Sequence, residues 1–258
     1  MSYTTIIVEE QGWVRKIRLN RPERRNAMTP LMQSELTTAL EDAGAGSCRV
    51  VILEGAGDAF CSGLDLSALQ AAKDKSAIEH REDADRISRL FRTLYELPKA
   101  TIAAVHGAAI AGGTGLATIC DFTLAVPEAK FGYTEVRIGF VPALVSAYLV
   151  LQIGEKRARD LLLTGRLFDA VEGYRLGLIT ELAAPQELSA RVQALAHTLC
   201  ANSPASVRAT KKLLAAQSRA WLDAAIASSL EANAAARETA DFHEGVASFL
   251  EKRKPTWC

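Results

Sequence analysis

Four glycines follow a short apolar run in the middle of the chain and could expose backbone N–H groups. The run covers residues 102–105, an apolar stretch covers residues 116–120, and between them stand Gly107, Gly112, Gly113 and Gly115. This pattern predicts a buried strand, a tight turn and the first turns of a buried helix. A helix N-terminus carries unpaired N–H groups and the positive end of the helix dipole. Such a corner can hold an oxyanion, although the same glycines could simply let a helix pack close to a strand.

A second corner of the same kind occurs earlier in the chain. A predicted strand at residues 50–53 leads into a glycine-rich turn that ends at Gly63-Leu64-Asp65-Leu66. Two corners, one near Leu64 and one near Gly112, could direct two N–H groups at one oxygen. Stabilising a thioester enolate requires such an arrangement.

One carboxylate stands in an apolar setting that suits proton transfer. Glu135 lies within residues 130–142, among aromatic and aliphatic side chains. Desolvation would raise the pKa of such a carboxyl group, which suits a general base. The alternative is a simple ion pair between Glu135 and the nearby Arg137.

Missing motifs argue against several other chemistries. No Gly-Lys-Ser/Thr follows the glycines, no third glycine completes a dinucleotide fingerprint, and no Gly-x-Ser-x-Gly occurs. The five cysteines and four histidines are scattered, so neither a disulfide framework nor a metal site is predicted.

The elements that must position these groups alternate between strands and helices. Residues 6–8 and 13–19 predict a hairpin, and an arginine-rich turn follows at residues 20–28. Thr29-Pro30 is a good helix start. Residues 67–97 are first charged and then apolar, which indicates a mobile lid-like stretch followed by a packed helix. From residue 185 onward the signals are helical.

Composition limits the partners and the compartment. The chain has 258 residues, of which 49% are hydrophobic, and its 30 basic and 30 acidic residues cancel. This balance argues against nucleic-acid and membrane surfaces but allows a local site for a phosphorylated ligand. Without a secretory signal or a membrane-length apolar span, we expect a soluble, cytoplasmic protein.

Taken together and in order, these motifs resemble the enoyl-CoA hydratase/isomerase, or crotonase, family over nearly the whole chain. The segments that carry the resemblance are Leu19-Asn20-Arg21-Pro22 with Asn26-Ala27, residues 59–66, residues 102–121, residues 131–142, Leu163-Thr164-Gly165, Gly177-Leu178-Ile179, and residues 249–254.

The resemblance implies an α/β fold in which a spiral of ββα repeats occupies residues 1–185 and a helical trimerisation region occupies residues 186–258. It implies a homotrimer, or a homohexamer made of two trimers, that acts on an acyl-CoA thioester. No separate cofactor is implied, because coenzyme A is part of the substrate.

The resemblance also assigns roles to individual residues. Glu135 would be the catalytic carboxylate, and the backbone N–H groups of Leu64 and Gly112 would form the oxyanion hole. The implied substrate-binding residues are Glu23, Arg24, Arg25, Asp65, Leu66, Gly115, Phe249 and Lys252. Of these, Phe249 and Lys252 would reach toward the nucleotide end of a neighbouring subunit's ligand.

One position departs from the family's hydratases, which usually carry two catalytic glutamates. Glu135 occupies the second position, but Gly115 occupies the first. A single carboxylate permits dehydration of a 3-hydroxyacyl-CoA, or its reverse, and also permits Δ3,Δ2-enoyl-CoA isomerisation. A non-catalytic member that binds RNA or a partner is a third reading, which the neutral charge and Glu135 disfavour.

We expect dehydration, because residues 112–116 and 134–143 look like those of bacterial methylglutaconyl-CoA hydratases of leucine catabolism. Gly115 would open volume for a branched, carboxylate-bearing acyl group, and Arg137 or Lys73 would meet the extra carboxylate. Glu79, Glu82 and Asp83 are conceivable substitutes for the missing glutamate.

Overall fold

Two sheets of mostly parallel strands form the centre of the molecule. The computed structural model describes residues 3–71 and 75–257. The larger sheet has the order β1 (Ile6–Gln11), β2 (Val14–Leu19), β3 (Val50–Gly55), β5 (Ala100–Val105), β7 (Phe122–Ala125), β10 (Glu181–Leu182). The smaller sheet has the order β4 (Ala59–Cys61), β6 (Ala108–Ile110), β8 (Lys130–Gly132), β9 (Phe168–Asp169). Only the β1–β2 and β8–β9 pairs among these described strands are antiparallel.

The chain alternates between the two sheets. β3, β5 and β7 each lie in the larger sheet and are followed by β4, β6 and β8 in the smaller one, and a helical segment comes next each time. This is the expected spiral of ββα repeats, and the predicted α/β fold class is confirmed. β5 lies between two parallel neighbours, and all six of its residues are buried. A strand in that position is expected to be mostly apolar, as residues 102–105 are.

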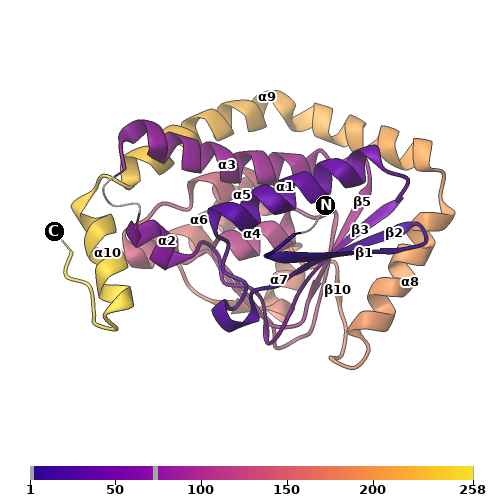
Figure 1. The fold of residues 1–258 in the computed structure, drawn as a ribbon, viewed down its shortest axis with the longest axis horizontal. Coiled ribbons are helices and arrows are strands. Elements are labelled where there is room, and N and C mark those ends of the chain that lie inside the picture. The colour runs from indigo at the N-terminus through magenta and orange to yellow at the C-terminus, as the bar shows by residue number, and fades with distance from the viewer. Residues whose placement is uncertain (1–2, 72–74, 258) are drawn as a thin grey trace.

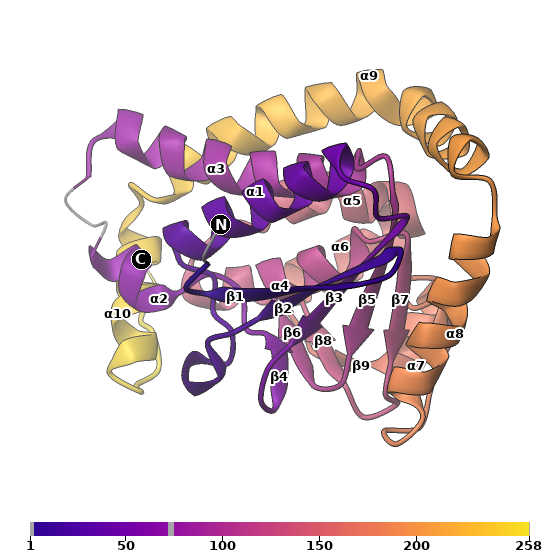
Figure 2. The same ribbon diagram turned by 45° about the vertical axis from the view of Figure 1, so that its right-hand side comes forward.

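Helices cover the strands and lie on one another (Figures 1 and 2). In the first half they are η1 (Pro22–Arg24), α1 (Pro30–Ala45), α2 (Leu66–Ala71), α3 (Ala77–Tyr95) and α4 (Gly112–Thr118). In the second half they are η2 (Glu135–Ile138), α5 (Ala143–Ile153), α6 (Glu155–Thr164), α7 (Ala170–Leu176), α8 (Leu188–Ala201), α9 (Pro204–Ala236) and α10 (Ala240–Leu250).

The C-terminal helices return to the middle of the chain. α9 is 33 residues long and runs along α3 and α5 (Figure 1). α10 then packs on η2 and α2. At Gly245 of α10 an added Cβ would collide with the Ile138 carbonyl, so only glycine permits this close approach to η2. The C-terminal region therefore supports the segment that carries Glu135.

The helical region shares its core with the spiral. Leu188, Val192, Leu222 and Ile226 belong to the same hydrophobic cluster as the strands. The division of the chain at residue 185 and the trimerisation role of residues 186–258 stay predictions.

The charged stretch after residue 67 is more regular than expected. α2 and α3 occupy most of it, and α3 begins with a capping box between Ser76 and Glu79. The charged residues Glu79, Arg81, Glu82 and Asp85 are exposed while the apolar residues Leu90 and Phe91 are buried, so these charges form a solvated face of a packed helix. Lys73, named above as a possible cation for the substrate, lies outside the described residues.

Candidate active site

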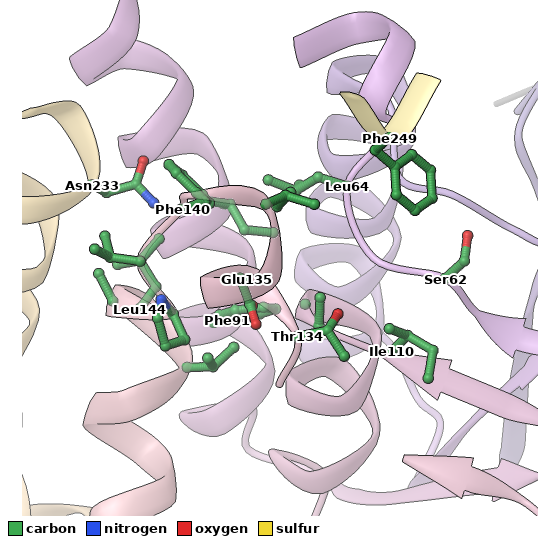
Figure 3. Close-up of a pocket in the computed structure, with 18 residues that line it drawn as sticks. Ser62, Leu64, Phe91, Ile110, Thr134, Glu135, Phe140, Leu144, Asn233 and Phe249 are labelled. Carbon is green, nitrogen blue, oxygen red and sulfur yellow. The ribbon is translucent and has the colours of Figure 1, made fainter. Parts of the chain in front are cut away.

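Glu135 lies in a largely apolar cavity of about 150 Å³ between the ends of several elements. Figure 3 shows it at the centre, with Leu64 and Phe249 to one side and Leu144 and Asn233 to the other. Among the described residues that line the cavity, Glu135 is the one ionisable side chain. Within the described part of the chain, this carboxyl group is therefore the candidate for transferring a proton to a ligand in the cavity.

The surroundings of Glu135 raise its pKa. Glu135 is the first residue of η2, which ends at Gly139 in the left-handed conformation. The residue is 9% exposed. Its Oε2 atom is buried and has no hydrogen-bond partner. Burial raises the pKa of Glu135 from 4.5 to about 7. A carboxyl group with this pKa can both accept and return a proton near neutral pH.

The two predicted oxyanion donors line the same cavity. Leu64 forms a parallel bridge with Met28 in which the hydrogen bonds run from Met28 N to Gly63 O (2.7 Å) and from Asp65 N to Met28 O (3.1 Å). The N–H of Leu64 is used in neither, and the N–H of Gly112, at the start of α4, has no partner among the described residues. Both groups remain free to bind a carbonyl oxygen.

Unusual backbone conformations hold these two corners together. Ala111 precedes α4 with φ 52° and ψ −124°, a strained conformation for a residue with a side chain. Gly63 has φ 89°, and a Cβ there would come within 2.9 Å of the Ile110 carbonyl oxygen and 3.5 Å of the Gly112 nitrogen. Only glycine allows the two turns to lie this close. This close approach brings the backbones of Leu64 and Gly112 to the same cavity.

A buried threonine fixes the start of α4 to the smaller sheet. Thr114 is fully buried, and its Oγ1 lies 2.6 Å from Ala109 O and 3.0 Å from Gly132 O. The same oxygen accepts a hydrogen bond from Gly132 N at 3.1 Å. These bonds join α4 to β6 and β8, so the position of the Gly112 N–H is set by the sheet.

Gly115 does not open space for the acyl group, and that prediction was wrong. Gly115 is not among the residues that line the cavity. A Cβ at Gly115 would meet Val145 Cγ1 at 2.6 Å and Phe91 Cζ at 3.3 Å. The space that a glutamate side chain would need is filled from α5 and α3.

Arg137 does not serve the cavity either. Its side chain is exposed and lies against Gly165, away from the cavity lining. It forms no ion pair with Glu135, whose Oε2 has no partner. Both predictions for Arg137, as the partner of Glu135 and as the site of the substrate's extra carboxylate, are therefore wrong.

The carboxylates considered as substitutes for the missing glutamate also lie elsewhere. Glu79 caps α3 through Ser76, and Glu82 is exposed. Asp83 binds Lys75 at 2.7 Å and Arg86 at 2.8 Å. None of these three residues lines the Glu135 cavity.

The arginine-rich turn lies next to the cavity. Arg25 O accepts a hydrogen bond from Ser62 N (3.0 Å), and Arg24 O accepts one from Ser62 Oγ (3.4 Å). Ser62 lines the cavity, whereas the side chains of Glu23, Arg24 and Arg25 are exposed. The two guanidinium groups are thus exposed on a turn that contacts the cavity lining, and the substrate-binding role of these three residues stays a prediction.

The other predicted binding residues fall in different places. Asp65 binds Arg21 at 3.0 Å and accepts hydrogen bonds from the first N–H groups of α2, away from the cavity. Leu66 begins α2. Phe249 is 57% exposed and lines the cavity of its own chain (Figure 3). Lys252 follows α10 on the surface, and contact of Phe249 or Lys252 with a neighbouring subunit's ligand stays a prediction.

Sequence reasoning missed Asn233 and Arg237 on α9 and just after it. Asn233 lines the cavity, is 4% exposed and accepts a hydrogen bond from Arg237 Nε at 3.2 Å. Because the amide oxygen binds the arginine, the NH₂ group of Asn233 is left to donate elsewhere. The signal was an Asn and an Arg four residues apart in an alanine-rich stretch, which places both on one helix face.

The remaining predicted absences concern metals and membranes. In residues 3–71 and 75–257, no group of three or more His, Cys, Asp and Glu side chains could hold a metal ion. None of the described helices is long and apolar enough to cross a membrane.

A buried carboxyl group and two residues with unpaired backbone N–H groups line one cavity of this α/β protein, an arrangement suited to holding a carbonyl oxygen while a proton moves nearby. The family model for enoyl-CoA hydratase/isomerase matches residues 9–258, and the chain belongs to this family. It is therefore an enzyme of the hydratase type, a lyase acting on carbon–oxygen bonds.

Relatives and solved structures agree with this assignment. A Thermus thermophilus protein provisionally named an enoyl-CoA hydratase is 46% identical over 95% of this chain and 98% of its own length. Crotonyl-CoA hydratase of Syntrophomonas wolfei is 33% identical over 98% of both chains. The crystal structure of an enoyl-CoA hydratase/isomerase from Xanthobacter autotrophicus superimposes with a TM-score of 0.91 at 30% identity, covering 97% of this chain and 94% of that one.

Proposed function

We propose that this enzyme interconverts 3-hydroxy-3-methylglutaryl-CoA and 3-methylglutaconyl-CoA with Glu135 as its single proton carrier. The observation that carries the proposal is the isolated carboxyl group of Glu135 in a cavity that also presents two free N–H groups. The motif resemblance of residues 112–116 and 134–143 supports the choice of acyl group.

One carboxylate can perform the whole reaction. Glu135 takes the C2 proton, and the electron pair moves to the thioester oxygen, which the N–H groups of Leu64 and Gly112 stabilise as an enolate. As the enolate collapses, the C3–O bond breaks, and Glu135 returns its proton to the departing hydroxyl group to form water. The carboxylate is thereby regenerated. A tertiary C3 hydroxyl group is easier to expel than a secondary one, which reduces the need for a second acid.

The same geometry supports one alternative. A single carboxylate can move a proton between C2 and C4 of an enoyl-CoA, which is Δ3,Δ2-isomerisation. The observation in its favour is that Phe91 and Val145 fill the space of a second acid. An isomerase needs only one proton carrier.

Turnover on four thioesters separates these functions. Purified protein is given 3-hydroxy-3-methylglutaryl-CoA, 3-methylglutaconyl-CoA, crotonyl-CoA and a 3-enoyl-CoA, each repeated with Glu135→Ala. We expect the two branched diacid thioesters to interconvert, crotonyl-CoA to react poorly, and Glu135→Ala to abolish turnover. Reaction of the 3-enoyl-CoA alone would establish the isomerase.

We also propose that the enzyme works as a trimer or a pair of trimers in the cytoplasm. Sedimentation of the purified protein tests the assembly. A monomer would contradict it.

A further inference from the structure

A second, smaller cavity lies beside the Glu135 cavity and is lined by charged side chains. Its volume is about 40 Å³, and it shares Leu64 and Ile87 with the Glu135 cavity. Its ionisable lining residues are Asp65, Lys75, Asp83, Arg86 and Arg237. A cavity needs only about 10–15 Å³ to hold a water molecule, so this one has room for a small polar group.

Arg237 is the unusual member of this set. The residue is 3% exposed, although a guanidinium group keeps its charge when buried. Its Nε donates to Asn233, but its Nη1 lies 3.6 Å from Asp83 Oδ2, beyond hydrogen-bond distance. The described residues thus leave the Nη groups without a hydrogen bond. Nη groups that line a cavity and have no hydrogen-bond partner among those residues are available to bind an anionic group.

The cavity also carries more positive than negative charge. Asp65 is engaged by Arg21 and by the N-terminus of α2. Lys75, Arg86 and Arg237 therefore share a single carboxylate, that of Asp83. These three cations therefore outnumber the carboxylate of Asp83, and a further negative charge in the cavity would reduce the excess.

Arg237 also touches the walls of the Glu135 cavity. Its guanidinium group lies 5.7 Å from the ring centroid of Phe140, and its Nε holds the amide of Asn233. Both Phe140 and Asn233 line the Glu135 cavity (Figure 3). The cation cluster thus adjoins the space where the acyl group is expected.

We propose that the cavity of Arg237, Arg86 and Lys75 binds a carboxylate at the far end of the acyl chain. This inference rests on the proposed function, which sets the length of the acyl chain between the thioester and the carboxylate. The cavity selects acyl-CoA thioesters that end in a carboxylate over those that end in a methyl group. Arg237 acts as a specificity-determining residue and touches no reacting atom.

Binding of two unreactive thioesters tests the proposal independently of turnover. Glutaryl-CoA ends in a carboxylate, and pentanoyl-CoA has a methyl group in its place. We expect calorimetry to show glutaryl-CoA binding to the wild-type protein roughly 10- to 100-fold more tightly, since one charge-assisted hydrogen bond is worth about that factor. Arg237→Gln should bring the ratio of the two Kd values close to one, and this ratio cancels any effect of the variant on the cavity walls that both thioesters share.

Two further variants complete the experiment. Arg208→Gln, at an exposed position of α9, should keep the full preference. Arg86→Gln, at a half-buried position of α3, should reduce it, and this variant decides the matter if Arg237→Gln fails to fold. A wild-type protein without preference, or a preference that survives both cavity variants, would overturn the subsite. If the preference is present but the branched diacid thioesters do not react, the subsite stands and the proposed function fails.

Discussion

Replacing Glu135 with glutamine should change both the activity and the pH dependence of stability, because one perturbed pKa governs both. The variant keeps the size of the side chain but cannot accept a proton. A positioned general base contributes about 10²- to 10⁴-fold to rate, so kcat/KM should fall by that factor. For the wild-type protein, kcat/KM should rise with pH up to about 7 and then level off, because the carboxylate form of Glu135 is the active one.

The stability effect follows from the same pKa. Burial raises the pKa of Glu135 from 4.5 to about 7. Between these values the folded protein keeps the proton that the unfolded chain has lost, so stability falls as pH rises. One pH unit corresponds to about 1.4 kcal/mol, which makes the loss about 3 kcal/mol in total. Glutamine does not titrate, so its variant has no such loss. The unfolding free energy of Glu135→Gln relative to the wild type should therefore rise by about 3 kcal/mol between pH 4.5 and 7 and stay constant above pH 7.

Urea unfolding at half-unit pH steps from 4 to 8.5 measures this difference. Any effect of the glutamine side chain that is independent of pH displaces the whole curve of unfolding free energy against pH without changing its shape. Glu231→Gln, at an exposed position of α9, is the matched control and should reproduce the wild-type curve. A stability difference between Glu135→Gln and wild type that stays flat across this range would refute the argument that Glu135 is desolvated.

Three further predictions concern the entrance, the oxyanion corner and the filled space. Replacing Arg24 and Arg25 by alanine should raise KM for a CoA thioester roughly 10-fold. The KM for the pantetheine thioester, which lacks the nucleotide, should not change. Equal effects on both thioesters would show that the two arginines do not bind the phosphates. Thr114→Val should lower the free energy of unfolding by about 1–3 kcal/mol, because the buried backbone groups of Ala109 and Gly132 lose their partner. Unfolding in urea measures this, and an unchanged midpoint of the urea transition would contradict it. Gly115→Glu should also destabilise the protein by about 1–3 kcal/mol through overpacking. Adding Val145→Ala should restore part of the lost melting temperature, because Val145 is the side chain that the new Cβ would meet first. Hydration of crotonyl-CoA by the Gly115→Glu variant would show that the space beside Gly115 is not filled.

The sequence predicts the parts of the site that depend on local order along the chain. The strand, turn and helix around Gly112 follow from one contiguous segment, and so does the apolar setting of Glu135. The contents of the space beside Gly115 do not, because Phe91 and Val145 come from α3 and α5, 24 and 30 residues away in the chain. The prediction that Arg137 contacts the cavity or Glu135 was wrong for a related reason. Its neighbour Glu135 faces the cavity, but the 3₁₀ turn directs the arginine toward Gly165.

The filled space beside Gly115 has a stereochemical consequence. If Glu135 alone removes the C2 proton and returns it to the departing hydroxyl group, both groups must leave from the face of the substrate that Glu135 approaches. Dehydration is then a syn elimination, whereas a second acid on the other side of the cavity would permit anti elimination. A 3-hydroxyacyl-CoA carrying deuterium stereospecifically at C2 distinguishes the two by the deuterium content of the product. Anti elimination would mean that a group other than Glu135 protonates the hydroxyl, and the single-carboxylate mechanism would have to be abandoned.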